Sequence, residues 1–322
     1  MDINVNFDFS LDTPGYWDNF WDNNHGYGGG GNRDPDYHSK TLQLYHQYLW
    51  SKPLPCGEEM KLECKGGKNY YWLEWNGINF ISDSIIVSFR HAKNKQMIEK
   101  VQNTVPDYKS YVENYVHKGY TIGGMIIFPM HSQSLNQRRG INPKIRDRWD
   151  LTLECIRRYY LGLESPLSSV LEKDRRFFDL FVNFKGYVDY FYLQDCVSRD
   201  YSKVDIWLGN GDFSENPLPQ TVEEYFQWID REMEFLNKRS TRILFEWLLR
   251  ENPIRHEDDG EYEKTIIDPE LPPGYKKTYA YFTREGKSCT KDNAYFCHVF
   301  IYNEIGVCVN DYRTWIVHRE GQ

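Results

Sequence analysis

The sequence predicts an α+β protein in which a mixed or antiparallel sheet packs against a mainly helical layer, with a small C-terminal β extension. Three observations lead to this prediction. Strand and hairpin patterns are concentrated in residues 60–90 and again after 275. Apolar residues at helical spacing dominate residues 145–252. The 322 residues, 40% of them hydrophobic, are enough for a packed core, at about 150 residues per domain.

Patterns in the first half of the chain define helices and strands in turn. Pro53 ends the first expected helix, and Asn76-Gly77 is a type I′ hairpin signal between two strands. The expected elements are a helix at 41–50, strands within 60–90, helices at 93–101 and 106–118, and a buried strand at 121–128.

The second half is mostly helical until Pro253. Ser165-Pro166 is expected to open one helix, and Thr221 with Glu224 forms a capping-box signature for another. Further helices are expected at 184–197 and 240–250, and strands at 278–283, 294–302, 306–310 and 314–318.

Composition shifts divide the chain into four expected parts. Residues 1–36 form an acidic segment with seven aspartates and one arginine, and its Gly28–Gly31 run is interpreted as a flexible loop. The main domain covers 37–252, and 253–274 is a linker of acidic and breaker residues. Residues 275–322 form a β extension too small to hold much core alone, so we expect it to dock on the main body.

Charge, hydropathy and cysteine content narrow the class of protein. The net charge of −8 argues against non-specific coating of nucleic acid, but it is compatible with a local basic site. No apolar run approaches the roughly 18 residues of a membrane helix, and the N-terminus lacks the basic and apolar regions of a secretory signal. The seven cysteines include no CxxC pair, so we expect reduced thiols in the cytoplasm and no zinc site.

Residues 138–158 are the strongest candidate in the sequence for a functional site. They carry seven basic and three acidic residues, a local charge of +4 in an acidic chain. A helix starting near Ile145 would place Asp147, Asp150 and Glu154 on one face and an apolar stripe on the other. Three carboxylates on one face repel one another, so this face requires a cation or arginines to compensate them.

Three interpretations of this segment stay open. The first is a structural ladder of ion pairs. The second is a recognition site whose arginines grip phosphate or carboxylate: Arg138, Arg139, Arg148, Arg157 and Arg158. The third is a catalytic site with Asp147, Asp150 and Glu154 as its acids, of which Asp150 and Glu154 hold Mg²⁺ or Mn²⁺.

Other polar candidates are weaker. His46 lies among aromatic residues on the first expected helix and is interpreted as a packing histidine. Arg250 with His256, and Arg313 with His318, have a spacing similar to that of the HEPN ribonucleases, but neither pair fits a single helix, so chance explains both.

Several segments together resemble an uncharacterised bacterial domain-of-unknown-function family over roughly residues 6–250. The segments are DPDYHSKTLQLYHQYLWSKPLP, GYTIGGMIIFP, INPKIRDRWDLTLECIRRYYLGLESPL and FKGYVDYFYLQD. The resemblance implies a single cytoplasmic domain that contains the charged helix, and it implies no activity, substrate or cofactor. The Gly/Asp-rich stretch at about 16–32 departs from the family pattern as an insertion, and the β piece after Pro253 as an addition.

These observations lead to two function hypotheses. The leading one is a cytoplasmic protein that binds a phosphate-bearing ligand of the nucleic-acid class, with cleavage or modification of that ligand left open. A role in phage–host conflict would suit an orphan family with insertions. The alternative is a non-enzymatic factor that binds a protein partner through its acidic N-terminal segment and aromatic surface. The sequence decides neither whether the protein is an enzyme nor its oligomeric state, and no membrane partner is expected.

Overall fold

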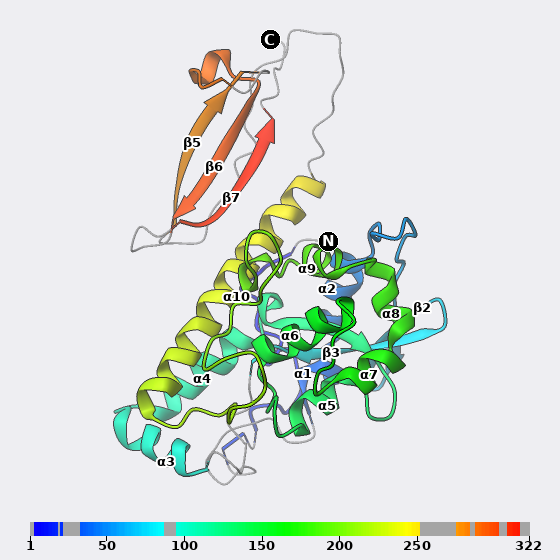
Figure 1. Ribbon diagram of the computed structural model, residues 1–322, viewed down its shortest axis with the longest axis vertical. Helices are drawn as coiled ribbons and strands as arrows, with labels where there is room; N and C mark the ends of the chain where they lie inside the picture. Colours follow the sequence, from blue (N-terminus) through cyan, green and yellow to red (C-terminus); the bar gives the residue numbers. More distant parts are fainter. Residues whose placement is uncertain are drawn as a thin grey trace. The chain divides into compact units, whose positions relative to one another are not determined.

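The computed structural model describes residues 3–18, 20–21, 33–86, 95–251, 275–283, 287–302 and 308–315. These residues form ten α-helices and two antiparallel sheets, which confirms the predicted α+β class (Figure 1). The chain separates into two compact units, Met1–Ser240 and Thr241–Gln322. Both Gly28–Gly31 and the expected linker at 253–274 lie outside the described residues, and the four-part division stays a prediction.

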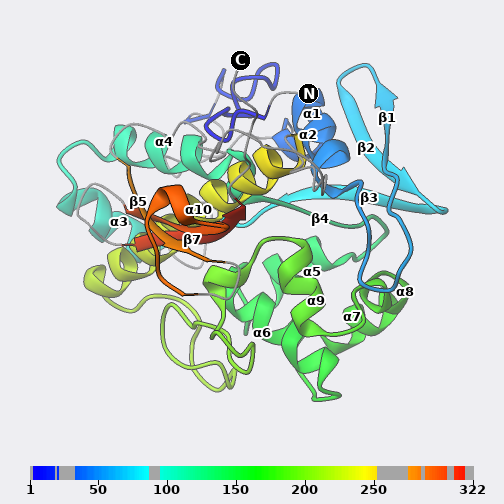
Figure 2. The same ribbon diagram turned by 90° about the horizontal axis from the view of Figure 1, so that it is seen from above.

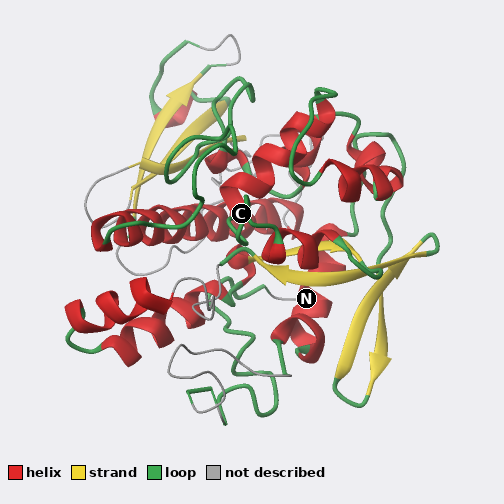
Figure 3. Ribbon diagram, turned by 60° about the horizontal axis from the view of Figure 1, so that its bottom comes forward, coloured by secondary structure: helices red, strands yellow, loops and turns green. Residues whose placement is uncertain are grey.

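The sheet of the first unit has four antiparallel strands in the order β1-β2-β3-β4. Their bounds are Glu63–Gly67 (β1), Tyr70–Trp75 (β2), Ile78–Ser84 (β3) and Met125–Pro129 (β4). Asn76 and Gly77 have φ angles of 49° and 72°, as the predicted type I′ turn requires. The β1–β2 hairpin turns away from the direction of β3 and β4 and projects from the body of this unit (Figures 2 and 3).

Five helices belong to the first half of the chain: α1 (Pro35–His38), α2 (Lys40–Trp50), α3 (Lys95–Thr104), α4 (Tyr108–Gly119) and α5 (Leu135–Ile141). The predicted helices at 41–50, 93–101 and 106–118 correspond to α2, α3 and α4. Ser39 caps α2, because its hydroxyl accepts a hydrogen bond from the amide of Leu42. The sequence patterns did not indicate α1 and α5, which are only four and seven residues long.

The second half supplies α6 (Trp149–Tyr160), α7 (Ser168–Lys173), α8 (Arg175–Phe178), α9 (Phe184–Tyr190) and α10 (Val222–Glu251). The prediction of one helix after Ser165 is wrong, because the backbone leaves helical geometry at Asp174 and separates α7 from α8. The two helices predicted after Thr221 are a single helix of 30 residues. Its predicted capping box is formed in part. The Thr221 hydroxyl accepts from the amide of Glu224 at 3.1 Å, but the Glu224 carboxylate accepts from the amide of Gln220 at 2.7 Å, one residue before the cap.

Helix α10 packs closely against the start of β4. The buried Arg239 guanidinium donates hydrogen bonds to the carbonyls of Gly123, Met125 and Phe191. A Cβ at Gly123 would lie 2.0 Å from the Ser240 hydroxyl oxygen, so only glycine permits this approach. Helix α4 lies beside α10 (Figures 1 and 3), and the two helices enclose part of the charged interior described below.

The second unit contains a three-stranded antiparallel sheet, β5-β6-β7. Its strands are Lys276–Phe282 (β5), Phe296–Tyr302 (β6) and Cys308–Trp315 (β7). The prediction of two separate strands at 306–310 and 314–318 is wrong, because the single strand β7 continues through residues 311–313. Of the described helices, none is both long and apolar enough to cross a bilayer.

Candidate functional site

The predicted helical face at 145–158 is only partly formed. Helix α6 begins at Trp149, not near Ile145, and the predicted apolar stripe is buried at Trp149, Leu153 and Ile156. Arg146 and Asp147 precede the helix with φ angles of 50° and 69°, in the left-handed region. Asp147 therefore does not share a helix face with Asp150 and Glu154, and that part of the prediction is wrong.

Asp150 is fully buried and paired with Arg148. The guanidinium Nε lies 3.1 Å from Asp150 Oδ1, and Nη2 contacts Oδ2. Asp150 Oδ2 also accepts from the amide of Trp207 at 2.8 Å, and Arg148 donates to the carbonyls of Leu208 and Pro217. The pair thus holds the loop at 205–218 against α6, and its polar atoms are occupied by protein groups.

Glu154 is similarly occupied by two arginines. Its carboxylate accepts from Arg157 at 2.7 and 2.9 Å and from Arg158 at 2.9 Å. Arg158 continues to the carbonyl of Gly211 at 2.9 Å and lies 4.8 Å from the ring centre of Phe213. The loop at 205–218 therefore contacts this end of the α6 face too.

These contacts favour the ion-pair interpretation of α6 over the metal and recognition interpretations. Asp150 and Glu154 have their oxygens engaged by guanidinium groups, so they do not fit a divalent cation in this arrangement. Within the part of the chain that the structure describes, no three His, Cys, Asp or Glu residues are grouped to hold a metal ion. The catalytic and binding roles assigned to these residues stay predictions.

Arg138 and Arg139 are adjacent in α5 but lie in different environments. Arg138 is half-buried and donates to the side chain of Gln133. Arg139 is only 1% exposed. Its Nη1 lies 3.0 Å from Asp83 Oδ2 and 2.9 Å from Asp147 Oδ1, and it also donates to the carbonyl oxygens of Ser84 and Asp147. Arg139 is therefore the centre of a second charged group, and this group also contacts α6, because Arg139 Nε donates to the Thr152 hydroxyl at 3.3 Å.

Asp83 and Asp147 contact this guanidinium, Asp36 is electrostatically coupled to it, and Asp34 is coupled to Asp36 and Asp83; we call these four carboxyl groups the carboxylate cluster. Burial raises the pKa of Asp83 to about 7, with Asp147 and Asp34 adding to the rise and Arg139 opposing it. Burial, and then Asp34 and Asp83, raise the pKa of Asp36 well above its usual value. Asp36 is 8% exposed, and its buried Oδ1 has no hydrogen-bond partner in the structure.

Local structure explains how these groups come together. Asp34 caps α1 by accepting from the amide of Asp36 at 3.2 Å, with Pro35 at the first helical position, so both carboxyls lie within one turn. Asp83 is near the end of β3. The left-handed turn returns the amide of Asp147 to the carbonyl of Arg139 at 2.9 Å, which places its carboxylate beside the guanidinium.

Glu232 of α10 extends the charged interior toward α6. It is fully buried, accepts from the hydroxyl of Tyr115 in α4, and has an unpartnered Oε1. Burial raises its pKa to about 8; Tyr115 and Arg139 lower it, whereas Asp150 and Asp147 raise it further. The interior of the first unit thus holds more carboxyl groups than its guanidinium groups neutralise.

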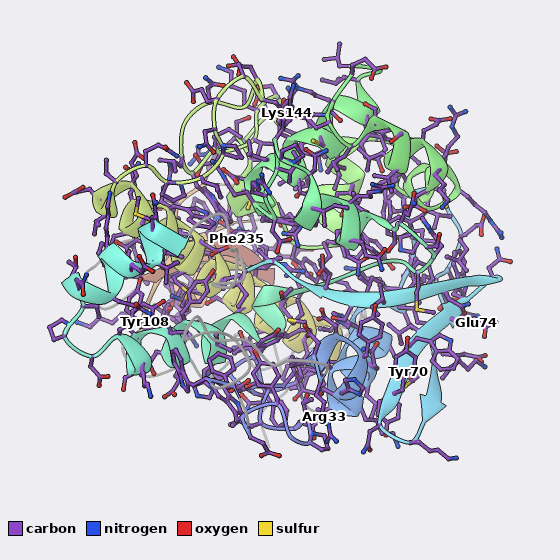
Figure 4. All side chains as sticks on the ribbon, turned by 90° about the horizontal axis from the view of Figure 1, so that it is seen from below. Arg33, Tyr70, Glu74, Tyr108, Lys144 and Phe235 are labelled. Carbon is purple, nitrogen blue, oxygen red and sulfur yellow. The ribbon has the colours of Figure 1, made fainter. Side chains whose placement is uncertain are left out.

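An aromatic ladder adjoins the carboxylate cluster. Tyr37 follows Asp36 in α1 and stacks on Tyr70 of β2, with ring centres 5.2 Å apart and planes 15° from parallel. Trp72 lies beside Tyr70, with ring centres 5.9 Å apart. Burial raises the pKa of Tyr37 to about 12, with Tyr70, Asp36, Asp83 and Asp34 adding to it, so its hydroxyl is electrostatically coupled to the cluster. Figure 4 shows Tyr70 on the projecting hairpin, where its side chain is 41% exposed.

Among the histidines considered in the sequence, His46 is described and does not belong to this site. His46 is fully buried between Ser82 and Trp50, which agrees with a packing role; its Nε2 lies 2.9 Å from the Ser82 hydroxyl, and burial lowers its pKa to about 3. His256 and His318 lie outside the described residues.

The sequence pattern indicates Arg139 and Asp147 as site residues, but not Asp34, Asp36 and Asp83. The available signals are the Asp-Pro-Asp sequence at the start of a helix and an aspartate between two serines near the end of a strand. Both signals are short, and without the fold nothing in them indicates proximity to Arg139.

The chain belongs to a family of unknown function, DUF6994, whose family model matches residues 3–243. The match includes the carboxylate cluster, the aromatic ladder and α6, and it ends before β5–β7. No curated protein and no solved structure matches the chain.

Proposed function

We propose that this protein is a cytoplasmic enzyme that binds and cleaves a phosphate-bearing ligand of the nucleic-acid class, with its acid and base in the carboxylate cluster. The observation that carries the proposal is the excess of buried carboxyl groups around Arg139, with Asp83 titrating near pH 7. A general acid or base is most effective when its pKa lies near the working pH. Structural ion pairs also perturb pKa values. The proposal is supported in addition by the buried Oδ1 of Asp36, which has no hydrogen-bond partner in the structure.

The cluster provides two groups with different protonation tendencies. Asp36 serves as the acid, because burial raises the pKa of its carboxyl well above its usual value. Asp83 lies 3.0 Å from Arg139 and serves as the base, because the guanidinium favours its ionised form. A pair of carboxyl groups whose environments separate their pKa values is the usual arrangement for acid–base catalysis.

Cations next to the cluster in the chain can receive the phosphate. Arg138 and Arg146 directly adjoin Arg139 and Asp147, and both are half-exposed. Lys144 is exposed and lies at the surface (Figure 4). Arg148, Arg157 and Arg158 form ion pairs with the α6 carboxylates. Among the described residues Arg138, Lys144 and Arg146 form none with them, so they are better placed to bind an anion.

Cleavage and gel-shift assays with purified protein and RNA, single-stranded DNA and duplex DNA test the proposal, with Mg²⁺, with Mn²⁺ and with EDTA. We expect Asp83→Asn to lose at least 100-fold in turnover, and the exposed Asp230→Asn to match the wild type. If Glu154→Gln abolished cleavage while Asp83→Asn retained it, the active centre would lie on α6. No shift and no cleavage by the wild type at low salt would contradict the proposal.

A specific surface supports the alternative of a protein-binding factor. Leu161 and Leu163, at the end of α6, are 56% and 52% exposed. Leu163 lines a surface pocket of about 690 Å³ together with Tyr159 and Tyr160. Exposed apolar side chains beside a pocket are typical of protein-binding surfaces. A stable complex that resists 0.5 M salt and is lost in Leu161→Ser/Leu163→Ser, with no turnover by the wild type, would favour this alternative.

A further inference from the structure

The turn that ends α6 leaves Leu163 exposed to solvent. Helix α6 ends in a Schellman motif: Gly162, with a φ angle of 68°, donates its amide to the carbonyl of Tyr159 at 3.0 Å, and Leu163 donates to that of Arg158 at 2.9 Å. The residue at the position of Leu163 frequently packs on an apolar side chain in the last helical turn. Here that turn offers Arg158, whose guanidinium contacts Glu154 and the carbonyl of a distant loop instead. The turn therefore does not bury the leucine.

The apolar surface at this end of α6 extends beyond Leu163. Leu161 is also exposed, and Tyr159 and Tyr160 directly precede it in the chain. Both tyrosine rings pack on Phe178 of α8, with ring centres 5.4 and 6.3 Å away. The Tyr160 hydroxyl donates to the carbonyl of Phe178 at 2.6 Å, which fixes this ring further. The exposed leucines thus adjoin a rigid aromatic base, as is typical of protein-binding surfaces.

The pocket of about 690 Å³ beside these side chains is acidic. It lies where α7 packs against α6 and α8 (Figure 2). Its charged lining consists of Glu164, Glu172, Arg175 and Asp179. Arg175 is paired with Glu172. Among the described residues neither Glu164 nor Asp179 forms an ion pair, so two carboxylates in the lining are not neutralised.

The pKa of Tyr159 is consistent with this charge. Burial raises it, and Asp179 and Glu172 raise it further, whereas Arg175 lowers it. The ring of Tyr159 therefore lies in the field of the carboxylates of the lining. A cation in the pocket would be attracted both by these carboxylates and by the face of an aromatic ring.

The charge of the pocket selects a basic occupant over an anionic one. A phosphate group would be repelled by the two carboxylates in excess, whereas a lysine or arginine side chain would be attracted. The neighbouring Lys173 and Arg176 do not offset this charge, because they donate to backbone carbonyls elsewhere and do not line the pocket. A small organic cation would leave Leu161 and Leu163 exposed, and a polypeptide would cover them.

We propose that this pocket is the docking site for a basic segment of a partner protein. A lysine or arginine side chain of that segment occupies the pocket beside Tyr159 and Asp179, and a large apolar side chain next to it packs on Leu161 and Leu163. The apolar contacts contribute most of the affinity, and the carboxylates select the partner. The inference does not rest on the proposed cleavage; it names the partner chemistry of the protein-binding surface described above.

Selection of random twelve-residue peptides displayed on phage, against the immobilised full-length protein, tests the chemistry of the partner. We expect the enriched peptides to carry lysine or arginine next to a large apolar residue and to be poor in acidic residues. A parallel selection against Leu161→Ser/Leu163→Ser should not enrich them. Enrichment of acidic or neutral peptides, enrichment of the same peptides by both proteins, or no enrichment at all would overturn the inference.

Fluorescence anisotropy with a labelled peptide of the selected consensus sequence then measures the dissociation constant. Leu161→Ser/Leu163→Ser should raise Kd about tenfold, because the apolar contacts are lost. Glu164→Lys/Asp179→Lys should raise Kd about tenfold at low salt and less at 0.5 M salt, where charges are screened. This charge-reversed protein should bind a peptide with glutamates in place of its basic residues more tightly than the wild type does. A misfolded variant could not produce that reversal, and its absence would overturn the role of the carboxylates.

Leu11→Ser and Asp230→Asn are the matched controls, because both residues are exposed and neither lines the pocket. Their Kd should stay within about twofold of the wild type. Thermal unfolding of each variant checks that it folds. Equal losses of binding in the controls and in the pocket variants would overturn the site.

The outcomes separate this inference from the proposed function. Peptide binding should be unchanged in Asp83→Asn, and cleavage should be unchanged in Leu161→Ser/Leu163→Ser. Cleavage without any peptide binding would keep the proposed function and overturn the inference. An oligonucleotide that bound the wild type but not Leu161→Ser/Leu163→Ser would also overturn it, because the pocket would then accept a phosphate-bearing ligand.

Discussion

Two groups of charged side chains lie in the first compact unit, and their charge ratios differ. On α6, Asp150 and Glu154 face Arg148, Arg157 and Arg158, so guanidinium groups outnumber carboxylates. In the carboxylate cluster, Arg139 contacts Asp83 and Asp147, and Asp34 and Asp36 add two further carboxyl groups. The α6 group is the more conspicuous in the sequence, because it is contiguous. The cluster is drawn from three separate regions of the chain, and it is the group that keeps unneutralised carboxyls.

This difference indicates how to distinguish charged side chains that stabilise the fold from those that can exchange a proton with a ligand. A buried ion pair with all its hydrogen bonds satisfied holds the chain in place, as Arg148 and Asp150 hold the loop at 205–218. A buried carboxyl in excess has its pKa raised toward neutrality and can exchange a proton with a ligand. The following four changes test this comparison, in order of expected effect.

Arg148→Met should give the largest loss of stability. It leaves Asp150 buried without its cation and frees the carbonyls of Leu208 and Pro217, which should lower the free energy of unfolding by about 3–5 kcal/mol. Urea denaturation followed by circular dichroism measures this loss. The double variant Arg148→Met/Asp150→Leu should recover part of it, and a loss below 1 kcal/mol in the single variant would show that the pair does not hold the fold.

Asp83→Asn should change how stability depends on pH. Burial raises the pKa of Asp83 from 3.8 to about 7, so the folded state keeps a proton that the unfolded state releases in this range. The stability from this group is fully present below about pH 4 and is lost as the pH rises to about 7. Since one pKa unit corresponds to about 1.4 kcal/mol, the wild type should lose on the order of 3 kcal/mol across this window.

The same urea titration, repeated at intervals between pH 4 and pH 8, compares the wild type with Asp83→Asn. The free energy of unfolding should fall less steeply with rising pH in Asp83→Asn than in the wild type. Glu232→Gln should reduce the remaining pH dependence, which extends to about pH 8. If the free energy of unfolding depended on pH equally in the wild type and both variants, the pKa values of Asp83 and Glu232 would not be raised by folding.

Glu154→Gln should have a smaller, purely structural effect. Glu154 is nearly buried, but its two arginines are 18% and 24% exposed, so water screens the pairs. We expect a loss of about 1 kcal/mol in the free energy of unfolding. A pH profile of turnover identical to that of the wild type would agree with this role, whereas a displaced profile would place Glu154 in the chemistry.

Lys144→Ala should have the smallest effect. Lys144 is exposed, so its loss should leave stability within about 0.5 kcal/mol and weaken the binding of an anionic ligand only a few-fold. Fluorescence anisotropy with a labelled oligonucleotide, at two salt concentrations, measures the change. The exposed Lys100 of α3 supplies the control Lys100→Ala, and an equal effect of both changes would contradict a phosphate-binding role for Lys144.

The elements with long, regular patterns could be predicted from the sequence, and the site largely could not. The helix at 41–50 and the Asn76-Gly77 turn depend on local spacing, which the sequence displays directly. The start of α6 was misplaced because Arg146 and Asp147 adopt left-handed conformations, and neither residue type signals this reliably. Residues after Ser165 were merged into one helix for a similar reason, since the break at Asp174 has no glycine or proline to mark it.

The partners of the charged residues were the least predictable feature. A helical projection placed Asp150 and Glu154 correctly on α6, but the loop at 205–218 that satisfies Asp150 is more than 50 residues away in the chain. Asp36 and Asp83 reach Arg139 only through the packing of α1, β3 and α5. Such long-range pairings depend on tertiary structure, which periodicity in one sequence does not encode.

The protonation of Asp83 tests the central claim most directly. The measurement follows the ¹³Cγ signals of labelled aspartates between pH 4 and pH 9 in the wild type and in Asp83→Asn. The account predicts a carboxyl that titrates near pH 7 in the wild type and is missing from the variant. If every aspartate of the wild type titrated below pH 5, the carboxylate cluster would be fully neutralised like the α6 group, and it would not be the acid–base centre.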